Sequence, residues 1–333
     1  MKTEPMLEND NLNKEIIQWS CKSIASLGYT LKSNQPEKIL ATLWSYVGRF
    51  ETSDGYIYLK HTPPLIALEA IIIQVLRDQF HAPVPTVIAH NTALNCFLMK
   101  DAGQSLRGIL KQKFDEALIC KAIDQFISLQ LAVADQVDVF LDIGVPDWRL
   151  DKLPNLYKNM IKQKDLLAAD GLSAIEINKL DELLPKIANL CKKGSAYSIK
   201  QTIVQPDFSD NNILIDNISQ NITIIDLGEI TISHPFFSLL NCFRQIKKHY
   251  ALTEKDELYV RIKQACFKHY MNFFGFKEQF LDAFTIISIL WYIYDMLSQY
   301  RLMLACGTKE VLALQQRKFS NTAKEFIVSI AKF

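Results

Sequence analysis

Residues 203–229 read IVQPDFSDNNILIDNISQNITIIDLGE, and this stretch decides the fold. Polar and turn-forming residues come first, two short apolar runs follow, and the second run ends on the carboxylate of Asp226. The runs NILID and NITIID flank a turn at residues 217–220, which predicts a short β-hairpin. Such a hairpin would bring Asp226 back toward Asp207 and Asn212, so we expect three oxygen-bearing side chains to meet at strand ends.

This group of side chains suits phosphoryl transfer. The reaction needs positioned charge more than covalent help: cations on the phosphate oxygens, oxygen ligands for those cations, and a carboxylate at the attacking hydroxyl. Magnesium prefers hard oxygen ligands and keeps several waters, so one or two side chains together with a nucleotide suffice. An aspartate, an asparagine five residues later and an aspartate after the next strand supply such a set.

The composition is that of an ordinary globular protein. Of 333 residues, 49% are hydrophobic and 22% charged, and the net charge of +1 favours neither nucleic acid nor a membrane surface as a partner. The opening MKTEPMLENDNLNKE lacks the features of a secretory signal. The longest apolar stretch, FTIISILWYIYDML, is shorter than the roughly 20 residues that span a bilayer and carries Asp295, so we expect a buried helix. Seven scattered cysteines fit a reducing, cytoplasmic location.

The chain divides into two parts that differ in the periodicity of their apolar residues. LWSYVGRFETSDGYIYLKHTPP alternates around Asp54-Gly55 and predicts a hairpin, and Thr62 resembles the cap of a buried helix over LIALEAIIIQVLRDQF. Strands are expected at residues 86–90 and 94–99. After Gly103 nearly every segment has helical periodicity. We therefore predict an α+β fold, with a small antiparallel sheet and one inserted helix in residues 1–103 and a larger, mostly helical lobe in residues 104–333.

These features together resemble the aminoglycoside phosphotransferase and choline kinase family, the small-molecule branch of the protein-kinase-like fold. In that family the loop usually reads H-G-D-x-x-x-x-N and precedes a strand that ends in aspartate. QPDFSDNN and DLG stand in those places here. Lys60 ends the strand YIYLK, Glu69 lies on the next helix, and FLMKDAG falls at the family's hinge. The resemblance covers most of the chain and implies a protein-kinase-like, two-lobe fold.

The resemblance also implies a role for each motif residue. Asp207 would orient or deprotonate the acceptor hydroxyl, and Asn212 with Asp226 would hold Mg²⁺. Lys60, held by Glu69, would contact the phosphates of ATP or GTP. Residues 1–103 would form the nucleotide-binding lobe, and residues 104–333 would hold the catalytic loop and the substrate pocket. The remaining implied nucleotide contacts come from the first loop and the hinge: Ser45, Tyr46, Lys100 and Ala102.

Three positions depart from the family pattern. Gln205 and Pro206 replace the family's histidine and glycine. The histidine normally hydrogen-bonds the backbone around the metal-binding aspartate, and glutamine also has a donor and an acceptor for that role. Pro206 fixes its own φ and biases Gln205 toward an extended conformation. Ser238 stands where an aspartate often follows the aromatic pair, and His234 beside a proline is interpreted as a turn residue.

The helix LWYIYDMLSQY offers a candidate contact for the acceptor. Trp291, Tyr294, Asp295 and Ser298 share one helical face. Rings beside a carboxylate can cage an amino or quaternary cation, although an aromatic stripe at this spacing is more often core packing. Two further carboxylates are candidates for a cationic substrate: Glu229 and Asp282.

The leading functional prediction is an O-phosphotransferase that moves the γ-phosphoryl group of ATP or GTP to a hydroxyl of a small molecule, with an amine as one candidate feature of that molecule. The alternative is a catalytically weak or inactive relative that binds nucleotide and acts through protein contacts. Gln205-Pro206 and Ser238 favour the alternative. The retained Lys60, Asn212 and Asp226 oppose it. A protein kinase fits less well, because Ser209 stands where protein kinases usually have lysine. The sequence leaves the acceptor and the choice between ATP and GTP open.

Overall fold

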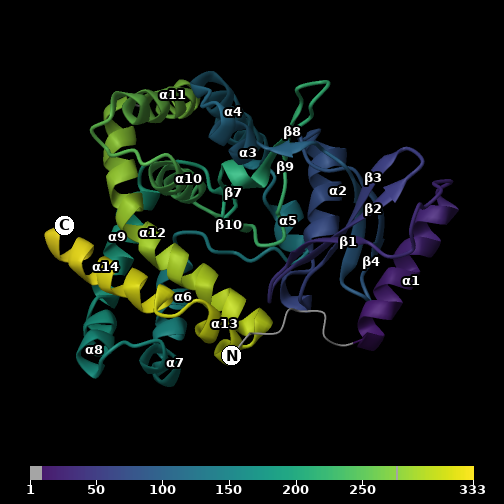
Figure 1. Cartoon of the computed structure of the whole chain (residues 1–333). Coiled ribbons are helices and arrows are strands. Elements are labelled where there is room, and N and C mark those ends of the chain that lie inside the picture. The colour runs from purple at the N-terminus through teal and green to yellow at the C-terminus, as the bar shows by residue number, and fades with distance from the viewer. Residues whose placement is uncertain (1–9, 275–276) are drawn as a thin grey trace.

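The computed structural model describes residues 10–274 and 277–333, and in it a small sheet lobe joins a larger helical lobe (Figure 1). The α+β, two-lobe architecture predicted from the sequence is confirmed. Residues 1–9 belong to the opening segment that suggested the absence of a secretory signal. That expectation therefore lies largely outside the described residues.

The small lobe is an antiparallel sheet of five strands in the order β1-β2-β3-β5-β4. Side chains on a strand point alternately to opposite faces, so each face has its own partner. Leu59 and Leu98 pack with Ile16 of α1 on one face, whereas Phe97 belongs to the main core that also contains α2. The elements of this lobe are α1 (Asp10–Ser26), β1 (Glu37–Ala41), β2 (Tyr46–Thr52), β3 (Gly55–His61), η1 (Pro64–Ile66), α2 (Glu69–Phe80), β4 (Val87–Asn91) and β5 (Cys96–Lys100).

The predicted first hairpin is confirmed as β2–β3. Thr52 pairs with Gly55 at the turn, where Gly55 has a φ of 103°, and Val47 pairs with Lys60 near the other end. The segment after β3 differs from the prediction. Thr62 does not cap a helix, because the chain first makes the short η1 turn and α2 starts only at Glu69. Helix α1, which covers the outer face of the sheet, was not predicted.

The two lobes are joined by the short segment between β5 and β6. Gly103 lies in this segment with a φ of 104°, and a Cβ atom there would lie 2.0 Å from the carbonyl oxygen of Ile215. Glycine is therefore required both for the left-handed backbone and for the close approach of the two chain segments. Gln104, the next residue, starts β6 and pairs with Ile215 of the large lobe.

The large lobe contains two small sheets among its helices. The predicted hairpin of the opening stretch is confirmed as β8–β9, in which Ile213 pairs with Ile224. A second pair, β7 with β10, was not predicted. The elements are β6 (Gln104–Ser105), α3 (Leu106–Gln112), α4 (Glu116–Val133), α5 (Asp138–Asp142), α6 (Leu153–Ile161), α7 (Lys164–Ala169), α8 (Ala174–Glu182), α9 (Leu184–Ser195), β7 (Thr202–Val204), η2 (Asp210–Asn212), β8 (Ile213–Ile215), β9 (Ile222–Ile224), β10 (Thr231–Ser233), α10 (Phe236–His249), α11 (Glu257–Phe274), α12 (Lys277–Cys306), α13 (Thr308–Leu314) and α14 (Lys318–Lys332).

Helix α12 is the central helix of the large lobe. Its segment Gln279–Cys306, which contains an 18-residue window of mean hydropathy 1.5, is long and apolar enough to cross a membrane by length and composition alone. The expectation that the apolar stretch is too short was therefore wrong. However, 61% of the apolar window is buried inside the protein, which confirms the interpretation as a buried helix. The helix packs against α6, α9, α10, α13 and α14.

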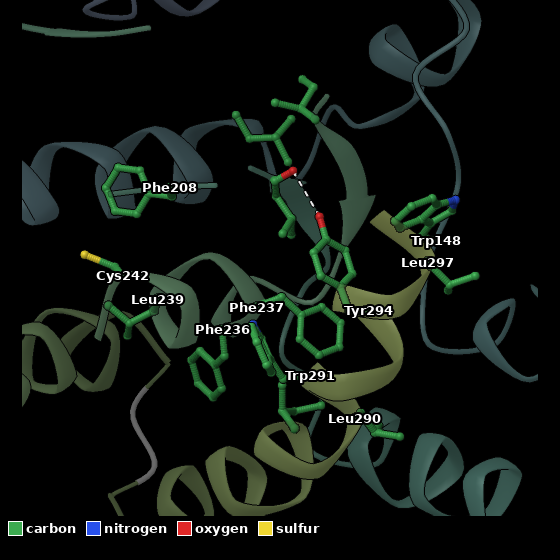
Figure 2. Close-up of a cluster of buried hydrophobic side chains, with 14 of the residues drawn as sticks. Trp148, Phe208, Phe236, Phe237, Leu239, Cys242, Leu290, Trp291, Tyr294 and Leu297 are labelled. Carbon is green, nitrogen blue, oxygen red and sulfur yellow. Dashed lines mark hydrogen bonds between the residues drawn. The ribbon is translucent and has the colours of Figure 1, made fainter. Parts of the chain in front are cut away.

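Aromatic side chains of α10 and α12 pack together in the core of the large lobe (Figure 2). Tyr294 stacks on Phe237 with 4.6 Å between ring centroids, and its hydroxyl lies 3.0 Å from that of Thr231. His234 is fully buried next to Phe236. Tyr294 and His234 are therefore core residues, and these stacked rings fix the positions of α10 and α12 relative to each other.

Candidate functional site

Two cavities meet at the junction of the lobes. The smaller, of about 320 Å³, lies between the sheet, the hinge and the β8–β9 hairpin. The larger, of about 940 Å³, lies on the other side of Asp226 and is walled by α10, α12 and α14. Trp44, from the loop between β1 and β2, and Asp226 line both cavities. A group that passes from one cavity to the other would therefore pass these two side chains.

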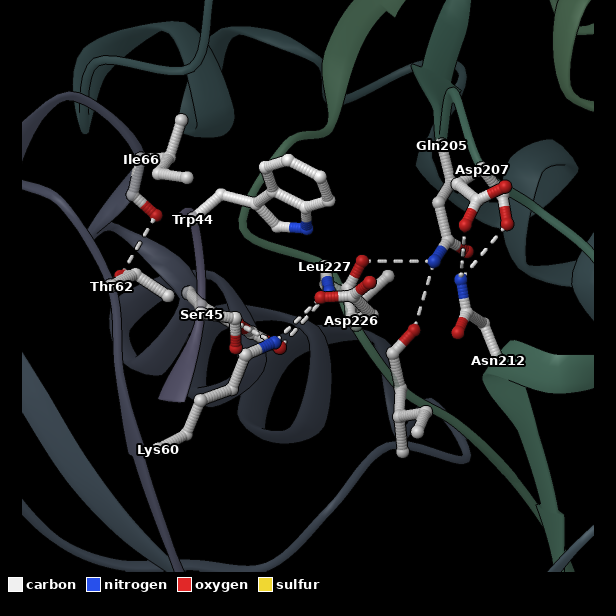
Figure 3. A network of polar contacts seen from close by, with 12 residues as sticks. Trp44, Ser45, Lys60, Thr62, Ile66, Gln205, Asp207, Asn212, Asp226 and Leu227 are labelled. Atoms are coloured by element: carbon white, nitrogen blue, oxygen red, sulfur yellow. Dashed lines mark hydrogen bonds and ion pairs between the residues drawn. The ribbon is translucent and has the colours of Figure 1, made fainter. Parts of the chain in front are cut away.

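A buried lysine lies between two carboxylates at this junction (Figure 3). The Nζ atom of Lys60 lies 2.5 Å from Oε2 of Glu69 and 2.6 Å from Oδ1 of Asp226. The other oxygen of Glu69 accepts a hydrogen bond of 3.1 Å from the backbone N–H of Leu227. Burial opposes the ammonium, but Asp226 and Glu69 together hold the pKa of Lys60 above its ordinary value, so the lysine stays charged.

The loop after β7 stands between the two cavities. The side-chain amide of Asn212 donates to the carbonyl oxygen of Asp207 at 2.9 Å and to its Oδ2 at 3.3 Å. Asp207 lines the larger cavity and Asn212 the smaller one. Burial raises the pKa of Asp207, and the nearby charge of Asp226 adds to that rise. A carboxyl with a raised pKa is better suited to accept a proton than an ordinary aspartate.

Gln205 makes the contact expected of the family's histidine. Its Nε2 donates to the carbonyl oxygens of Ile225 and Asp226, each at 2.9 Å (Figure 3). Asp226 has a φ of 63°, a left-handed conformation that costs energy for a residue with a side chain and needs support from its surroundings. Ser238 in turn holds the backbone of Gln205, because its Oγ accepts from the N–H at 2.8 Å and donates to the carbonyl at 3.0 Å. The expectation that glutamine keeps the scaffold contact is confirmed.

A second set of contacts fixes the catalytic loop from the other side. The guanidinium of Arg107 donates to Oδ1 of Asp210 at 2.7 and 3.0 Å, and the hydroxyl of Tyr250 donates to Oδ2 of the same carboxylate. Arg107 also reaches Oγ of Ser209 at 3.4 Å. No pattern in the sequence predicts this arrangement, because Arg107, Asp210 and Tyr250 lie far apart in the chain.

The structure brings most of the predicted nucleotide-side residues to the smaller cavity, with one exception. Ser45, Lys100 and Ala102 line it, but Tyr46 does not. Tyr46 lies on the opposite face of β2, where it packs in the cluster under α1, and its neighbour Val47 faces the cavity instead. The loop ends one residue earlier than predicted, and a shift of one residue moves a strand side chain to the other face of the sheet.

The predicted acceptor-side residues separate into two groups. Glu229, Trp291 and Asp295 line the larger cavity. Asp282 is exposed on α12 and does not line it, and Tyr294 is in the core, so the predicted stripe on α12 does not form a complete aromatic cage. The residues that the sequence analysis missed in this cavity are Trp44 and the charged side chains of α10 and α14, which have no distinguishing pattern in the sequence.

The donor set fits a magnesium ion. Both hydrogen bonds of the Asn212 amide use its nitrogen, which leaves its oxygen available, and the Asp226 side chain is 42% exposed. In the described part of the chain no group of three or more His, Cys, Asp or Glu forms a metal cluster. The protein would therefore contribute only these two oxygen ligands, in keeping with the preference of Mg²⁺ for a few carboxylates together with water and phosphate.

Comparison with known proteins supports the fold. No protein-family model matches the sequence, and no curated protein matches it significantly. A choline kinase from Cryptosporidium parvum matches with a TM-score of 0.58 at 12% identity, over 96% of this chain and 99% of that one. The GDP complex of an aminoglycoside 2′-phosphotransferase variant matches at 0.55 and 14%, over 95% and 98% of the two chains. A macrolide 2′-phosphotransferase matches at 0.60 and 11%, over 91% and 96%.

These structures cover nearly the whole chain at low identity, so the likeness is one of fold. The chain has the two-lobe, protein-kinase-like fold of the small-molecule kinases and phosphotransferases, and the resemblance seen in the sequence is confirmed at that level.

Proposed function

We propose that this protein transfers the γ-phosphoryl group of ATP or GTP to a hydroxyl group of a small molecule. The observation that carries the proposal is the junction of the two cavities. The ion triad of Lys60, Glu69 and Asp226 borders the smaller cavity, and Asp207 stands directly across in the larger one. One cavity thus offers charge for a nucleotide phosphate, and the other offers a carboxylate for an attacking hydroxyl.

Each residue has a definite part in the proposed reaction. Lys60 holds the nucleotide phosphates, and Asn212 and Asp226 hold Mg²⁺, which supplies positive charge to the phosphate oxygens when bound. The acceptor oxygen forms a bond to the γ-phosphorus as the bond from that phosphorus to the β-phosphate oxygen breaks. The hydroxyl proton passes to Asp207, and the nucleoside diphosphate leaves.

An unsatisfied hydroxyl group supports the nucleotide part of the proposal. Ser45 is buried in the wall of the smaller cavity, and its Oγ has no hydrogen-bond partner among the described residues. Buried polar groups are rarely left without a partner. A phosphate oxygen of a bound nucleotide would supply one. The related aminoglycoside 2′-phosphotransferase structure is a GDP complex, which also favours a nucleotide for this cavity.

The main argument for the alternative, an inactive relative, was the replacement of the family's histidine by Gln205. Gln205 replaces the usual histidine but makes two hydrogen bonds to the backbone around Asp226, and Ser238 fixes Gln205 in place. The departures from the family motif therefore preserve the geometry of the metal-binding aspartate. We also propose a cytoplasmic location, which the free state of all seven cysteines supports.

Thermal unfolding with Mg-ATP and with Mg-GTP tests the proposal. A ligand at a hundredfold excess over its Kd stabilises the folded state by about 2.7 kcal/mol. We therefore expect a magnesium-dependent rise of the Tm with at least one nucleotide. Asp226→Asn should abolish that rise, whereas Asp165→Asn, on the exposed face of α7, should keep it. No rise with either nucleotide in the wild-type protein would contradict the proposed function.

A further inference from the structure

The aromatic ring predicted to attract a substrate cation already holds a cation of the protein itself. The guanidinium carbon of Arg244, on α10, lies 4.3 Å from the ring centroid of Trp291. The same guanidinium pairs with Glu325 of α14 at 3.6 Å. A substrate ammonium would have to displace this tethered group to reach the ring face. The ring face of Trp291 in the larger cavity is therefore not free to bind a substrate ammonium.

The carboxylate of Asp295, which lies beside this ring, already has hydrogen-bond donors within the protein. Oδ2 of Asp295 accepts hydrogen bonds from Nε2 of Gln299 at 2.7 Å and from Oγ1 of Thr322 at 3.0 Å. Burial raises the pKa of Asp295, and the positive charges of Lys318 and Arg244 act against that rise. The negative charge of Asp295 thus has hydrogen-bond donors and nearby cations, and it does not need a cationic substrate for balance.

A second carboxyl group of the cavity, that of Glu229, also does not require a cationic substrate group. Glu229 lines the inner end of the cavity, next to Asp226. Burial and the charge of Asp226 raise the pKa of Glu229 to about 7, with Arg301 acting in the opposite direction. Arg301, which donates a hydrogen bond of 3.0 Å to the backbone carbonyl oxygen of Glu229, is the cation that the protein itself places beside this carboxyl.

Two lysines of the same cavity differ from these carboxylates, because among the described residues their ammonium groups make no direct ion pair, although the charge of Lys318 acts on Asp295 and Asp207. Lys247 is paired with Glu254 at 2.7 Å. Lys248, one helical turn after Arg244, and Lys318, at the start of α14, line the cavity and are exposed. Among the described residues, neither lysine side chain makes an ion pair or a hydrogen bond. A ligand could therefore bind the ammonium groups of Lys248 and Lys318 without breaking a direct ion pair of the protein, whereas the carboxylate of Asp295 already has its own hydrogen-bond donors.

We infer that the acceptor is a hydroxylated molecule that carries an anionic group, a carboxylate or a phosphate, bound by Lys318 and Lys248 with Arg244 beside them. The inference rests on the proposed function and specifies its substrate class. The anionic group would anchor the acceptor in the outer part of the cavity. The free hydroxyl would then reach Asp207, and the phosphoryl transfer described above would follow on that hydroxyl.

Fractions of a small-molecule extract, separated by charge, test this inference. A protein-free yeast extract is divided by ion exchange into anionic, neutral and cationic fractions, and each is incubated with the full-length protein and Mg-ATP or Mg-GTP. Release of nucleoside diphosphate is measured, and products are identified by mass spectrometry. A second sample of the anionic fraction is treated with phosphatase, which is removed before the assay, so that phosphate-bearing acceptors are distinguished from carboxylates.

Two charge-reversal variants and one control complete the experiment. Lys318→Glu and Lys248→Glu change exposed side chains, so both variants should fold. Each should lower turnover of the anionic fraction at least tenfold. Lys121→Glu, on the exposed face of α4, should leave that turnover unchanged. All three variants should keep the nucleotide-dependent rise of the Tm.

Each outcome decides the question. Turnover confined to the anionic fraction and lost in the two variants would support the inference. The inference would be overturned if the nucleotide stabilises the protein but turnover occurs mainly with cationic or neutral compounds, or with no fraction. It would also be overturned if the charge reversals had no effect on turnover. Absence of nucleotide stabilisation in the wild-type protein would instead overturn the proposed phosphotransferase function.

Discussion

The two cavities at the lobe junction are built in different ways. The smaller cavity takes its walls from strands in fixed register and from the hinge, and apolar side chains such as Val47 and Met99 lie near the buried pair of Lys60 and Glu69 and the partly exposed Asp226. The larger cavity takes most of its wall from α10, α12 and α14 and carries exposed charges of both signs. In the smaller cavity a few buried ions define the chemistry, whereas in the larger one many weaker contacts select a ligand.

This difference has an energetic consequence. A buried charge loses its hydration and depends entirely on its partner, so the ion triad must be complete to be stable. An exposed pair such as Arg244–Glu325 contributes little to stability and can be rearranged by a ligand. The smaller cavity is therefore expected to tolerate few substitutions, and the larger one many. Four predictions test this contrast, beginning with the largest effect.

The largest effect is expected at the boundary between the cavities. Asp207→Asn removes the proton acceptor, so phosphoryl transfer should fall by roughly 10²- to 10⁴-fold. The nucleotide-dependent rise of the Tm should remain, because Asp207 lines the acceptor side. Nucleoside diphosphate release and thermal unfolding measure the two quantities. If the variant also lost nucleotide binding, the assignment of Asp207 to the acceptor cavity would be wrong.

The second prediction compares one ion pair from each cavity. Glu69→Gln removes one buried partner of Lys60, and the free energy of unfolding should fall by about 3 kcal/mol, the lower end for a broken buried pair, because Asp226 remains. Glu325→Gln breaks the exposed pair with Arg244 and should cost less than about 1 kcal/mol. Urea denaturation of both variants gives the two values. Equal losses would remove the energetic contrast between the cavities.

The third prediction concerns the support of Asp226. Gln205→Ala leaves two carbonyl groups without their donor, which should cost about 1–3 kcal/mol of stability and weaken Mg-nucleotide binding. Gln205→His restores a donor and should recover part of both losses. Gln299→Ala, which loses a contact to Asp295 in the larger cavity, serves as the control and should leave nucleotide binding unchanged. Nucleotide titration calorimetry and urea denaturation measure the effects.

The smallest effect is a pH dependence in the larger cavity. Burial, with the charge of Asp226, raises the pKa of Glu229 from an ordinary 4.5 to about 7, so the unfolded chain loses this proton more readily than the folded protein. The stability that the neutral carboxyl provides is present below about pH 4.5 and is lost as the pH rises through about 7. Glu229→Gln should therefore become more stable than wild type over that range, by about 1 kcal/mol, since the side chain is only partly buried. A constant difference between pH 4 and pH 8 in urea denaturation would exclude this effect.

Local patterns in the sequence were sufficient for the motif and its surroundings. Alternation around Gly55 predicted the β2–β3 hairpin and placed Lys60 near its end, and the five-residue spacing from Asp207 to Asn212 predicted that these two residues share one loop. These features depend on turn chemistry and on the two-residue period of strands, which act over a few residues. The error at Tyr46 has the same origin, because one residue of misplacement in a strand exchanges its two faces.

The acceptor cavity was decided by tertiary structure alone. The meeting of Arg244, Trp291 and Glu325 depends on how three separate helices pack, and so does the location of Lys318 near Asp295. Helical periodicity shows which face of each helix is buried, but not which side chains of another helix it will face. Long-range burial of apolar surface fixes that choice. The sequence therefore determined which side chains form the motif around Asp207, Asn212 and Asp226, and only the folded protein determined which side chains line the larger cavity.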